Sequence, residues 1–198
     1  MPGAREAGGV PAPPAGGLPP PAPVRKRVPL WLRTLAFTAV FPGTVAGVIP
    51  WLLAGGTHAW PLALGPARWV GAVVLAGGVL VYVLTAWQFG AAGHGTPAPW
   101  DAPTALVGSG LHAWVRNPMY QGVLLCIVGE ALLAEAGALL AYAAVAWVVF
   151  HLRVITHEEP ALRRQFGPAY ESYLRRVPRW LPRGPQDRAQ VGRRDGTR

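Results

Sequence analysis

Charged side chains are almost absent from the middle of this chain. Between Thr34 and Leu152 the only Arg, Lys, Asp or Glu residues are Arg68, Asp101, Arg116, Glu130 and Glu135. A water-soluble domain could not cover its surface with so few charges, whereas hydrocarbon excludes charge because each ion placed there costs free energy. The uncharged runs approach or exceed the roughly 18 residues that suggest a transmembrane helix. The chain is therefore predicted to be an integral membrane protein.

Four apolar segments divide this region and predict an all-α, polytopic membrane helix bundle of about four transmembrane helices. They cover residues 31–53, 69–89, 119–134 and 137–155. Pro42 and Pro50 fall inside the first segment, so a kink is expected there. Only residues 135–137 separate the last two segments, which are therefore expected to form a tight helical hairpin.

The composition divides the chain into four parts. Residues 1–28 consist mostly of Pro, Gly and Ala and cannot bury enough surface to offset the entropy of ordering the chain, so they are predicted to be a disordered tail. Residues 29–93 hold the first two apolar segments. Residues 94–183 hold a loop rich in Pro and Gly, the hairpin and the C-terminal helices. Residues 184–198 are predicted to be a second disordered tail.

The formal net charge of +9 lies mainly in the tails. Ten arginines lie between Arg163 and Arg198, but no basic helix alternates with base-stacking aromatic residues, so we expect anionic lipid head groups as partners and no nucleic acid. Four spans would place the basic N-terminal tail, the loop containing Arg116 and the basic C-terminal tail on one side of the membrane. The positive-inside rule identifies that side as the cytoplasm, so both termini are predicted to be cytoplasmic.

The segment after the last apolar run has the pattern of short amphipathic helices. Pro160 and Pro168 each suit the first turn of a helix. Apolar residues then recur at spacings of three to four against a set of arginines: Leu162, Phe166, Tyr170, Tyr173 and Leu174. We expect these helices to lie on the membrane surface and to end in an interfacial anchor at residues 179–183.

Metal-ligand patterns are missing from the sequence. The single cysteine, Cys126, lies inside an apolar segment, and the five histidines include no pair at a ligand spacing on one helix face. No metal is expected. For the two carboxylates of the hairpin, Glu130 and Glu135, we expect packing or interfacial roles rather than catalysis.

Three polar clusters border the predicted hairpin on its cytoplasmic side. They cover residues 104–112, 116–120 and 157–159. If the two helices of the hairpin are antiparallel, both open ends lie on that side and the three clusters converge. The residues themselves therefore predict a polar pocket at a membrane surface.

A longer pattern in the same region resembles a known family. It reads Arg116-Asn117-Pro118-Met119-Tyr120-x-Gly122, then Glu158-Glu159-x-x-Leu162-x-x-x-Phe166-Gly167-x-x-Tyr170-x-x-Tyr173, then Val177-Pro178-Arg179. Over about residues 88–183 the chain is similar to the isoprenylcysteine carboxyl methyltransferases and their bacterial relatives, which include phospholipid N-methyltransferase-like members. The resemblance implies a methyltransferase core at residues 94–183 that uses S-adenosyl-L-methionine. It also implies an acceptor that is a membrane lipid or a lipidated or hydrophobic small molecule with a carboxylate, thiol or amine head group.

The resemblance also implies a set of site residues. The implied cofactor-binding residues are Thr104, Ala105, Leu106, Val107, His112, Asn117, Pro118, Met119, Tyr120 and Glu158. The implied catalytic residues are Arg116, Arg153 and Glu159. Arg153 is assigned because relatives carry an arginine at the position of Val154. Many relatives have His where this chain has Asn117, and because an amide does not titrate, general-base catalysis by Asn117 is excluded. Many relatives also have Tyr where this chain has His112.

Methyl transfer requires few catalytic side chains. The sulfonium is already a strong electrophile, so the enzyme mainly holds the methyl group and the nucleophile in line. A carboxylate or thiolate acceptor needs no base. An amine acceptor would need one, for which Glu159, His157 and His112 are the candidates.

Other interpretations remain open at this point. Arg116 would also serve as a positive-inside anchor, and Glu158 and Glu159 as a favourable helix N-terminus. The C-terminal region is also distantly similar to membrane reductases of the sterol-reductase type, which bind a nicotinamide cofactor. A third alternative is a non-catalytic membrane protein that retains the fold.

Overall fold

A computed structural model describes residues 29–56, 61–93 and 105–182. The predicted disordered tails and residues 94–104 of the predicted loop, which include Thr104, lie outside these residues. Apart from one isolated β-bridge between Pro61 and Ala136, regular structure in the described ranges is helical. The elements are α1 (Leu30–Gly43), η1 (Thr44–Val48), α2 (Ile49–Gly56), η2 (Gly65–Trp69), α3 (Val70–Gly93), η3 (Gly110–Ala113), α4 (Pro118–Leu133), α5 (Gly137–Arg153), η4 (Val154–Glu158), α6 (Glu159–Phe166) and α7 (Pro168–Arg176).

Three continuous helices are long and apolar enough to cross a membrane. They run over Trp31–Ala54, Gly65–Ala91 and Gly137–Phe166. The third predicted span, residues 119–134, corresponds to α4, which is apolar but has only 16 residues. The chain is thus a helical integral membrane protein, as the scarcity of charge indicated.

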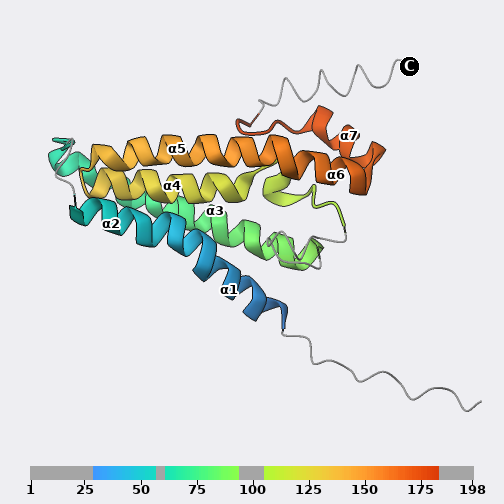
Figure 1. Ribbon diagram of the computed structural model, residues 1–198, viewed down its shortest axis with the longest axis horizontal. Coiled ribbons are helices and arrows are strands. Elements are labelled where there is room, and N and C mark those ends of the chain that lie inside the picture. Colours follow the sequence, from blue (N-terminus) through green and yellow to red (C-terminus); the bar gives the residue numbers. More distant parts are fainter. Residues whose placement is uncertain (1–28, 57–60, 94–104, 183–198) are drawn as a thin grey trace, which may run out of the picture.

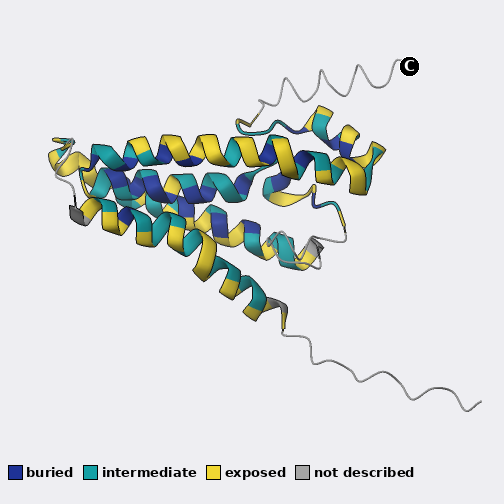
Figure 2. Cartoon of the chain, in the orientation of Figure 1, coloured by how far each residue is buried: buried dark blue, intermediate teal, exposed yellow. Residues whose placement is uncertain are grey.

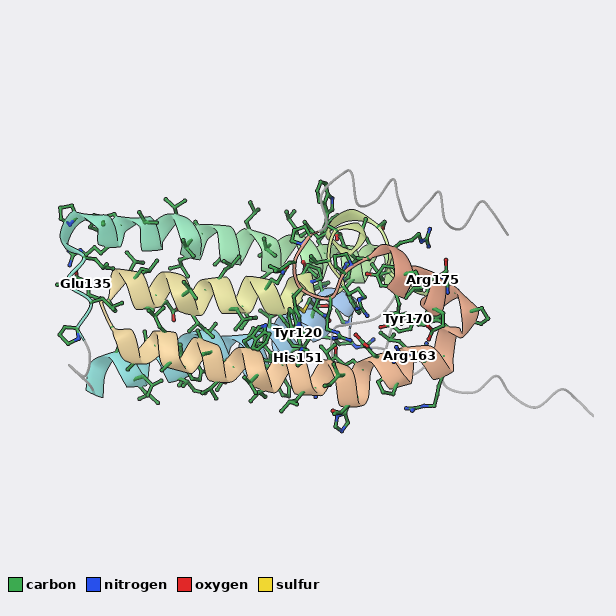
Figure 3. The ribbon with its side chains drawn as sticks, turned by 90° about the horizontal axis from the view of Figure 1, so that it is seen from above. Tyr120, Glu135, His151, Arg163, Tyr170 and Arg175 are labelled. Carbon is green, nitrogen blue, oxygen red and sulfur yellow. The ribbon has the colours of Figure 1, made fainter. Side chains whose placement is uncertain are left out.

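The helices place the predicted polar clusters at one end of the bundle. α3, α4 and α5 lie side by side, α5 continues through η4 into α6, and α1 leans away from the others (Figure 1). The start of α4 and the ends of α3 and α5 share the end that carries α6 and α7. Figure 3 shows Tyr120, Arg163 and Tyr170 at this end and Glu135 at the other.

Glycines bring the backbones of α3 and α4 into direct contact. Gly71 and Gly78 of α3 face Gly122 and Gly129 of α4. A Cβ on Gly78 would lie 2.7 Å from the backbone nitrogen of Cys126, and one on Gly122 would lie 2.8 Å from that of Tyr82. Small residues at such positions let membrane helices approach closely and gain packing contacts. This glycine seam joins the first half of the chain to the second.

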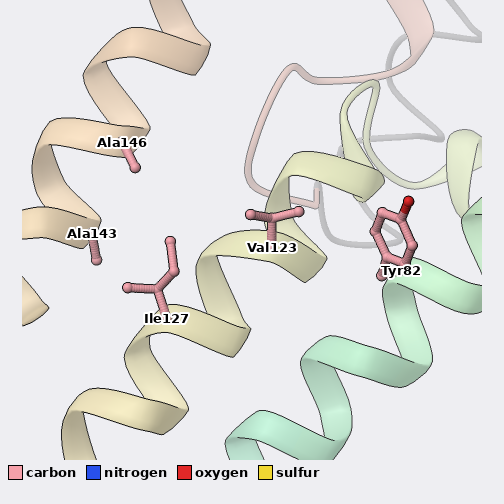
Figure 4. Close-up of a cluster of buried hydrophobic side chains, with 5 residues drawn as sticks. All are labelled: Tyr82, Val123, Ile127, Ala143 and Ala146. Atoms are coloured by element: carbon pink, nitrogen blue, oxygen red, sulfur yellow. The ribbon is translucent and has the colours of Figure 1, made fainter. Parts of the chain in front are cut away.

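Helix α4 is the centre of the bundle. Its residues Val123 and Ile127 pack between Tyr82 of α3 and Ala143 and Ala146 of α5 (Figure 4). The outer faces of α1, α3 and α5 carry exposed apolar side chains (Figure 2). Such faces are suited to lipid, which explains why a chain with so small a buried core is apolar almost throughout.

The kink expected in the first span is present, and Pro50 explains it. The Ile49 amide donates to the Thr44 carbonyl, five residues back. The next hydrogen bond of this kind would join residue 50 to the Val45 carbonyl, but Pro50 has no N–H to donate. The chain accommodates this with the π-turn η1, where Ala46 departs from helical geometry (φ −111°, ψ 17°). The Tyr142 hydroxyl of α5 donates to the Val45 carbonyl at 2.9 Å, so the carbonyl is satisfied inside the membrane.

The same local chemistry recurs at the end of α5. Pro160 also lacks the amide that an uninterrupted helix would need, and the π-turn η4 again ends two residues before the proline. One extra residue rotates all following residues by about 100° around the helix. The π-turn therefore decides which face carries Glu158 and Glu159.

At the opposite end of the bundle, Glu135 joins two loops. Its backbone has φ 51°, and its Oε1 accepts hydrogen bonds from the amides of Leu64 and Gly65 at 2.9 and 2.8 Å. The Leu62 amide donates to the Glu135 carbonyl at 2.7 Å. Glu135 thus has the packing role that we expected for it.

Helices α6 and α7 are amphipathic, but their apolar faces do not point where we expected. Tyr170, Tyr173 and Val177 are buried and pack with residues of both helices and with Leu106. The turn at Gly167, with φ 49°, folds α7 back on α6 and makes this packing possible. The apolar faces of α6 and α7 therefore pack on each other and on Leu106, within the protein.

Candidate functional site

A cavity of about 460 Å³ lies at the end of the bundle where the polar clusters converge. This volume is within the range of ligand-binding pockets, roughly 300–1,000 Å³. The predicted site residues that line it are Ala105, Leu106, Val107, His112, Arg116, Asn117, Pro118, Met119, Tyr120, Arg153, Glu158 and Glu159. These are all of the predicted site residues that the structure describes, since Thr104 lies outside the described ranges.

The carboxylate of Glu159 is buried and binds two arginines directly. Its Oε1 accepts from Arg116 Nη1 at 2.8 Å and from Arg179 Nε at 2.7 Å, and its Oε2 accepts from Arg179 Nη2 at 3.0 Å. Arg163, one turn along α6, approaches Oε2 at 3.8 Å. Glu159 therefore joins the start of α4, helix α6 and the segment that follows α7.

Residues 177–181, which we call the C-terminal strap, lie against the start of α4. The Arg116 amide donates to the Pro178 carbonyl at 2.9 Å, and the Asn117 side-chain amide to the Arg179 carbonyl at 3.2 Å. The side-chain amide of Gln121 donates to the carbonyl of Trp180. The strap thus holds the Arg-Asn-Pro motif in place from outside the cavity.

A second polar group surrounds Tyr120. The Tyr120 hydroxyl donates to Glu158 Oε1, and Arg153 Nε donates to the same carboxylate oxygen at 2.9 Å and to the Tyr120 hydroxyl at 3.1 Å. The Tyr120 ring stacks on Phe150 with centroids 4.6 Å apart. Arg153 and Glu158 are partly exposed, with side-chain accessibilities of 44% and 31%. These groups therefore remain reachable by a ligand.

His112 is buried in the cavity wall and retains an unused nitrogen. Its Nδ1 is buried without a hydrogen-bond partner, and its ring lies 5.7 Å from that of Phe89. The Tyr173 hydroxyl donates to the His112 carbonyl at 2.7 Å. Burial lowers the pKa of His112 from 6.5 to about 4, so the imidazole is neutral at physiological pH. A neutral ring with a free nitrogen can hydrogen-bond a ligand.

The three candidate bases differ in what their surroundings allow. Glu159 is occupied by Arg116 and Arg179, and a carboxylate held by two arginines resists protonation. His112 has too low a pKa to take a proton near neutral pH. His157 is exposed and its Nδ1 lies 2.6 Å from the Thr156 hydroxyl. The two buried candidates are thus unsuited to taking a proton, whereas His157, which also lines the cavity, remains available.

Several residues of the site were not in the predicted set. Phe37, Phe89, Tyr170 and Tyr173 line the cavity, and Arg179 binds Glu159. Tyr170, Tyr173 and Arg179 belong to the long sequence pattern, which could have assigned them to the site. Nothing in the sequence connects Phe37 or Phe89 with residues so far along the chain.

His151 and Trp180 form a further contact beside the strap. The Trp180 indole donates to His151 Nδ1 at 3.0 Å, and the His151 ring stacks on Trp147 with centroids 5.4 Å apart. His151 therefore bonds within the protein. Trp180 belongs to the segment that we expected to anchor the chain at the interface, and in the structure its indole binds His151 of α5.

Comparison with known proteins places the site in a family context. A family model described as Phospholipid methyltransferase matches residues 66–169. The chain is 37% identical over 78 residues to the protein-S-isoprenylcysteine O-methyltransferase of Schizosaccharomyces pombe, covering 39% of this chain and 33% of that protein. It is equally identical over 78 residues to protein-S-isoprenylcysteine O-methyltransferase B of Arabidopsis thaliana, covering 39% of each.

A third relative carries a different name. The nickel-cobalt-cadmium resistance protein NccN of Alcaligenes xylosoxydans xylosoxydans is 35% identical over 80 residues, which is 40% of this chain and 37% of that protein. In these relatives the matched region covers between 33% and 39% of the protein. No solved structure matches the chain.

Proposed function

The chain belongs to the phospholipid methyltransferase family, and on that premise we propose that it transfers a methyl group from S-adenosyl-L-methionine to a lipophilic acceptor at the membrane surface. The observation that carries the proposal is the cavity of about 460 Å³, because every described residue that the sequence pattern assigned to a methyl-transfer site lines it. If these residues served only to stabilise the fold, they would not be expected to line one cavity of ligand size.

The cofactor would be held by the segment 105–107, by residues 117–120 and by Glu158. Bound there, it supplies a methyl group activated by a sulfonium. The backbone of the 105–107 segment is covered by α7 and can offer hydrogen bonds to a nucleoside. Glu158 and the Tyr120 hydroxyl offer negative charge and hydrogen bonding, which suit the cationic donor. The free Nδ1 of His112 adds a further hydrogen-bonding position.

For the acceptor we propose a carboxylate on a hydrophobic chain. A carboxylate oxygen would form its bond to the methyl carbon with its own electron pair, while the carbon–sulfur bond breaks and S-adenosylhomocysteine leaves with that bond's electrons. No side chain would have to remove a proton from the acceptor. This suits a site whose buried candidate bases are occupied or hold a low pKa. Arg153 is partly exposed, and the Nε of Arg116 is buried without a partner, so both can attract an anionic head group.

The roles of the two acidic residues then differ. Glu158, partly exposed and bonded to Tyr120, would contact the ligand, whereas Glu159 would act as a positioning residue that fixes Arg116 and the strap. This assignment changes the catalytic role that the sequence implied for Glu159, since its hydrogen bonds are used within the protein.

The proposal includes four spans with both termini in the cytoplasm. It also includes anionic lipid head groups as partners of the basic tails and of the exposed arginines of α6 and α7, such as Arg164 and Arg176. Reporter fusions at residues 10 and 190 test the topology. Both should report the cytoplasm, and a periplasmic-type signal from either would contradict it.

The cofactor is tested by thermal stabilisation of the purified protein. S-adenosylhomocysteine should raise the unfolding temperature and NADPH should not, because a ligand that binds the native state stabilises it. The opposite result would favour the reductase alternative. Stabilisation by neither would support a protein that retains the fold without the activity.

The acceptor is tested with labelled S-adenosyl-L-methionine and two membrane probes. N-acetyl-S-farnesylcysteine presents a carboxylate, and phosphatidylethanolamine presents an amine. We expect methyl transfer to the first, with kcat/KM rising along a series of chain lengths because each buried CH₂ contributes up to ~0.8 kcal/mol. Transfer to the amine alone would refute the carboxylate assignment, and equal kcat/KM across the series would refute a lipophilic acceptor.

A further inference from the structure

Helix α1 lies outside the region that the family model matches, which begins at residue 66. It leans away from the bundle (Figure 1), and in the most apolar window of the Trp31–Ala54 helix only 6% is buried. Fully buried residues are therefore rare in this helix, and many of its apolar side chains, such as Leu35 and Val40, are exposed. A helix with so little packing would be expected to serve only as an anchor, unless a particular contact gives it another role.

One residue of α1 supplies such a contact. Phe37 is partly buried and lines the cavity, and among the described side chains of α1 it is the one that does so. Phe41, one turn further along, stacks on Phe37 with ring centroids 5.1 Å apart, but it is 46% exposed and does not line the cavity. Two similar side chains on the same helix thus differ in their access to the site.

A hydrogen bond inside the membrane fixes this side of α1 against α3. The Thr38 hydroxyl donates its single proton to the Thr34 carbonyl at 2.8 Å, so in the 2.7 Å contact between Thr38 Oγ1 and Tyr82 Oη the tyrosine is the donor. No water competes for these groups in hydrocarbon. The bond therefore holds Phe37, the neighbour of Thr38, at the cavity.

The lining of the cavity differs in chemistry from one helix to the next. The charged and hydroxyl groups come from the start of α4 and from α5, η4, α6 and α7, whereas α1 and α3 contribute the phenyl rings of Phe37 and Phe89. A phenyl ring offers no strong hydrogen bond to a nucleoside or an amino acid, but it packs well against a hydrocarbon chain. Because exposed apolar residues such as Leu35 and Val40 flank it on α1, Phe37 lies where such a chain would leave the bilayer for the site.

We propose that Phe37 is the specificity-determining residue of the acceptor site, and that its ring limits the bulk of the hydrocarbon chain beside the reacting head group. This inference rests on the proposed methyl transfer and deepens it. It gives α1 a role in choosing the acceptor, while the residues that bind the cofactor lie within or close to the matched region.

The test compares Phe37→Ala, Phe37→Trp and the matched control Phe41→Ala in the full-length protein. Each is assayed with N-acetylcysteine carrying an S-geranyl, S-farnesyl or S-geranylgeranyl chain. Phe37→Ala should raise the ratio of kcat/KM for the geranylgeranyl over the geranyl probe by roughly ten-fold, since a pocket discriminates by at least that factor when its size changes by a methylene or more. Phe37→Trp should lower the ratio, and Phe41→Ala should leave it within about two-fold.

A second readout does not depend on turnover. A photoreactive benzoylphenylalanine at position 37 should crosslink an alkyne-tagged S-farnesylcysteine, and excess untagged probe should abolish the crosslink. The same group at position 41 should label lipid without competition. An unchanged kcat/KM ratio in both Phe37 variants, or a crosslink at 37 that resists competition, would overturn the inference. Competed crosslinking in a protein that methylates no probe would instead refute the proposed reaction and leave Phe37 as part of a lipid-binding site.

Discussion

Replacing Glu159 by glutamine should loosen the C-terminal strap, because this carboxylate holds Arg116 and Arg179 together. Glutamine has almost the same shape and keeps one carbonyl acceptor, so the cavity is not enlarged. What is lost is the negative charge between two guanidinium groups. The strap, which contains Arg179, then loses its ionic attachment to the start of α4.

The size of the effect follows from burial. The side chains of Arg116 and Glu159 are 13% and 5% exposed, and removing one partner of a buried ion pair typically costs ~3–5 kcal/mol. Since glutamine retains some hydrogen bonding, we expect ~3 kcal/mol for opening of the strap. Glu171 offers a matched control, because it also pairs with an arginine, Arg163, but both side chains are exposed by 49% and 45%. An exposed pair contributes ~0–1 kcal/mol.

Hydrogen exchange followed by mass spectrometry measures this difference. At ~1.4 kcal/mol for each factor of ten, exchange of peptides covering residues 170–182 should accelerate by about 100-fold in Glu159→Gln and by less than about ten-fold in Glu171→Gln. Peptides from α3 should exchange as in the wild type. Equal acceleration in the two variants would show that Glu159 is not the residue that holds the strap.

Three further predictions concern the cavity, the glycine seam and pH. Tyr120→Phe and Glu158→Gln should each weaken the binding of S-adenosylhomocysteine, measured by calorimetry, about ten-fold, because each removes a hydrogen-bond partner from a partly buried polar group. Unchanged affinity in both variants would place the cofactor elsewhere. Gly122→Ala should lower the yield of folded protein, since the new Cβ would lie 2.8 Å from the Tyr82 amide nitrogen. Gly77→Ala should be tolerated, because no atom lies within 4 Å of the Cβ that it adds. Equal yields would argue against backbone contact between α3 and α4. Burial lowers the pKa of His112 to about 4, so between pH 6.5 and pH 4 the unfolded chain binds a proton at this residue that the folded protein does not. The free energy of unfolding should therefore fall by up to ~1.4 kcal/mol per pH unit as the pH drops from 6.5 towards 4. His112→Asn should reduce this slope, and an unchanged slope would assign the loss of stability to other groups.

The membrane character and the location of the site could be predicted from the sequence because both depend on local patterns. The scarcity of charge between Thr34 and Leu152 has few physical explanations other than lipid. It predicted about four spans, of which the structure has three as long apolar helices and one as the shorter helix α4. The convergence of the polar clusters followed from the short connection at residues 135–137. Once two antiparallel helices are assumed, their free ends must lie together.

What could not be predicted depends on contacts between distant segments. The glycines of α3 and α4 recur every seven residues, but many membrane helices contain glycine, and the sequence does not say which helix each one faces. The apolar face of α6 and α7 was expected on lipid, since a hydrophobic face does not reveal its partner. Only the turn at Gly167 decides that it covers Leu106 instead.

The register of the glycine seam also determines the depth of the site. With Gly122 packed against Tyr82, the antiparallel arrangement sets Pro118, where α4 begins, level with about Ala86. Helix α3 continues seven residues beyond that level to Gly93, which is roughly 10 Å at 1.5 Å per residue. The central helix therefore ends short of its neighbours and forms the floor of a pit. One extra turn at the start of α4 would fill about half of that depth. The depth of the binding site is therefore set by how far α3 extends beyond the start of α4.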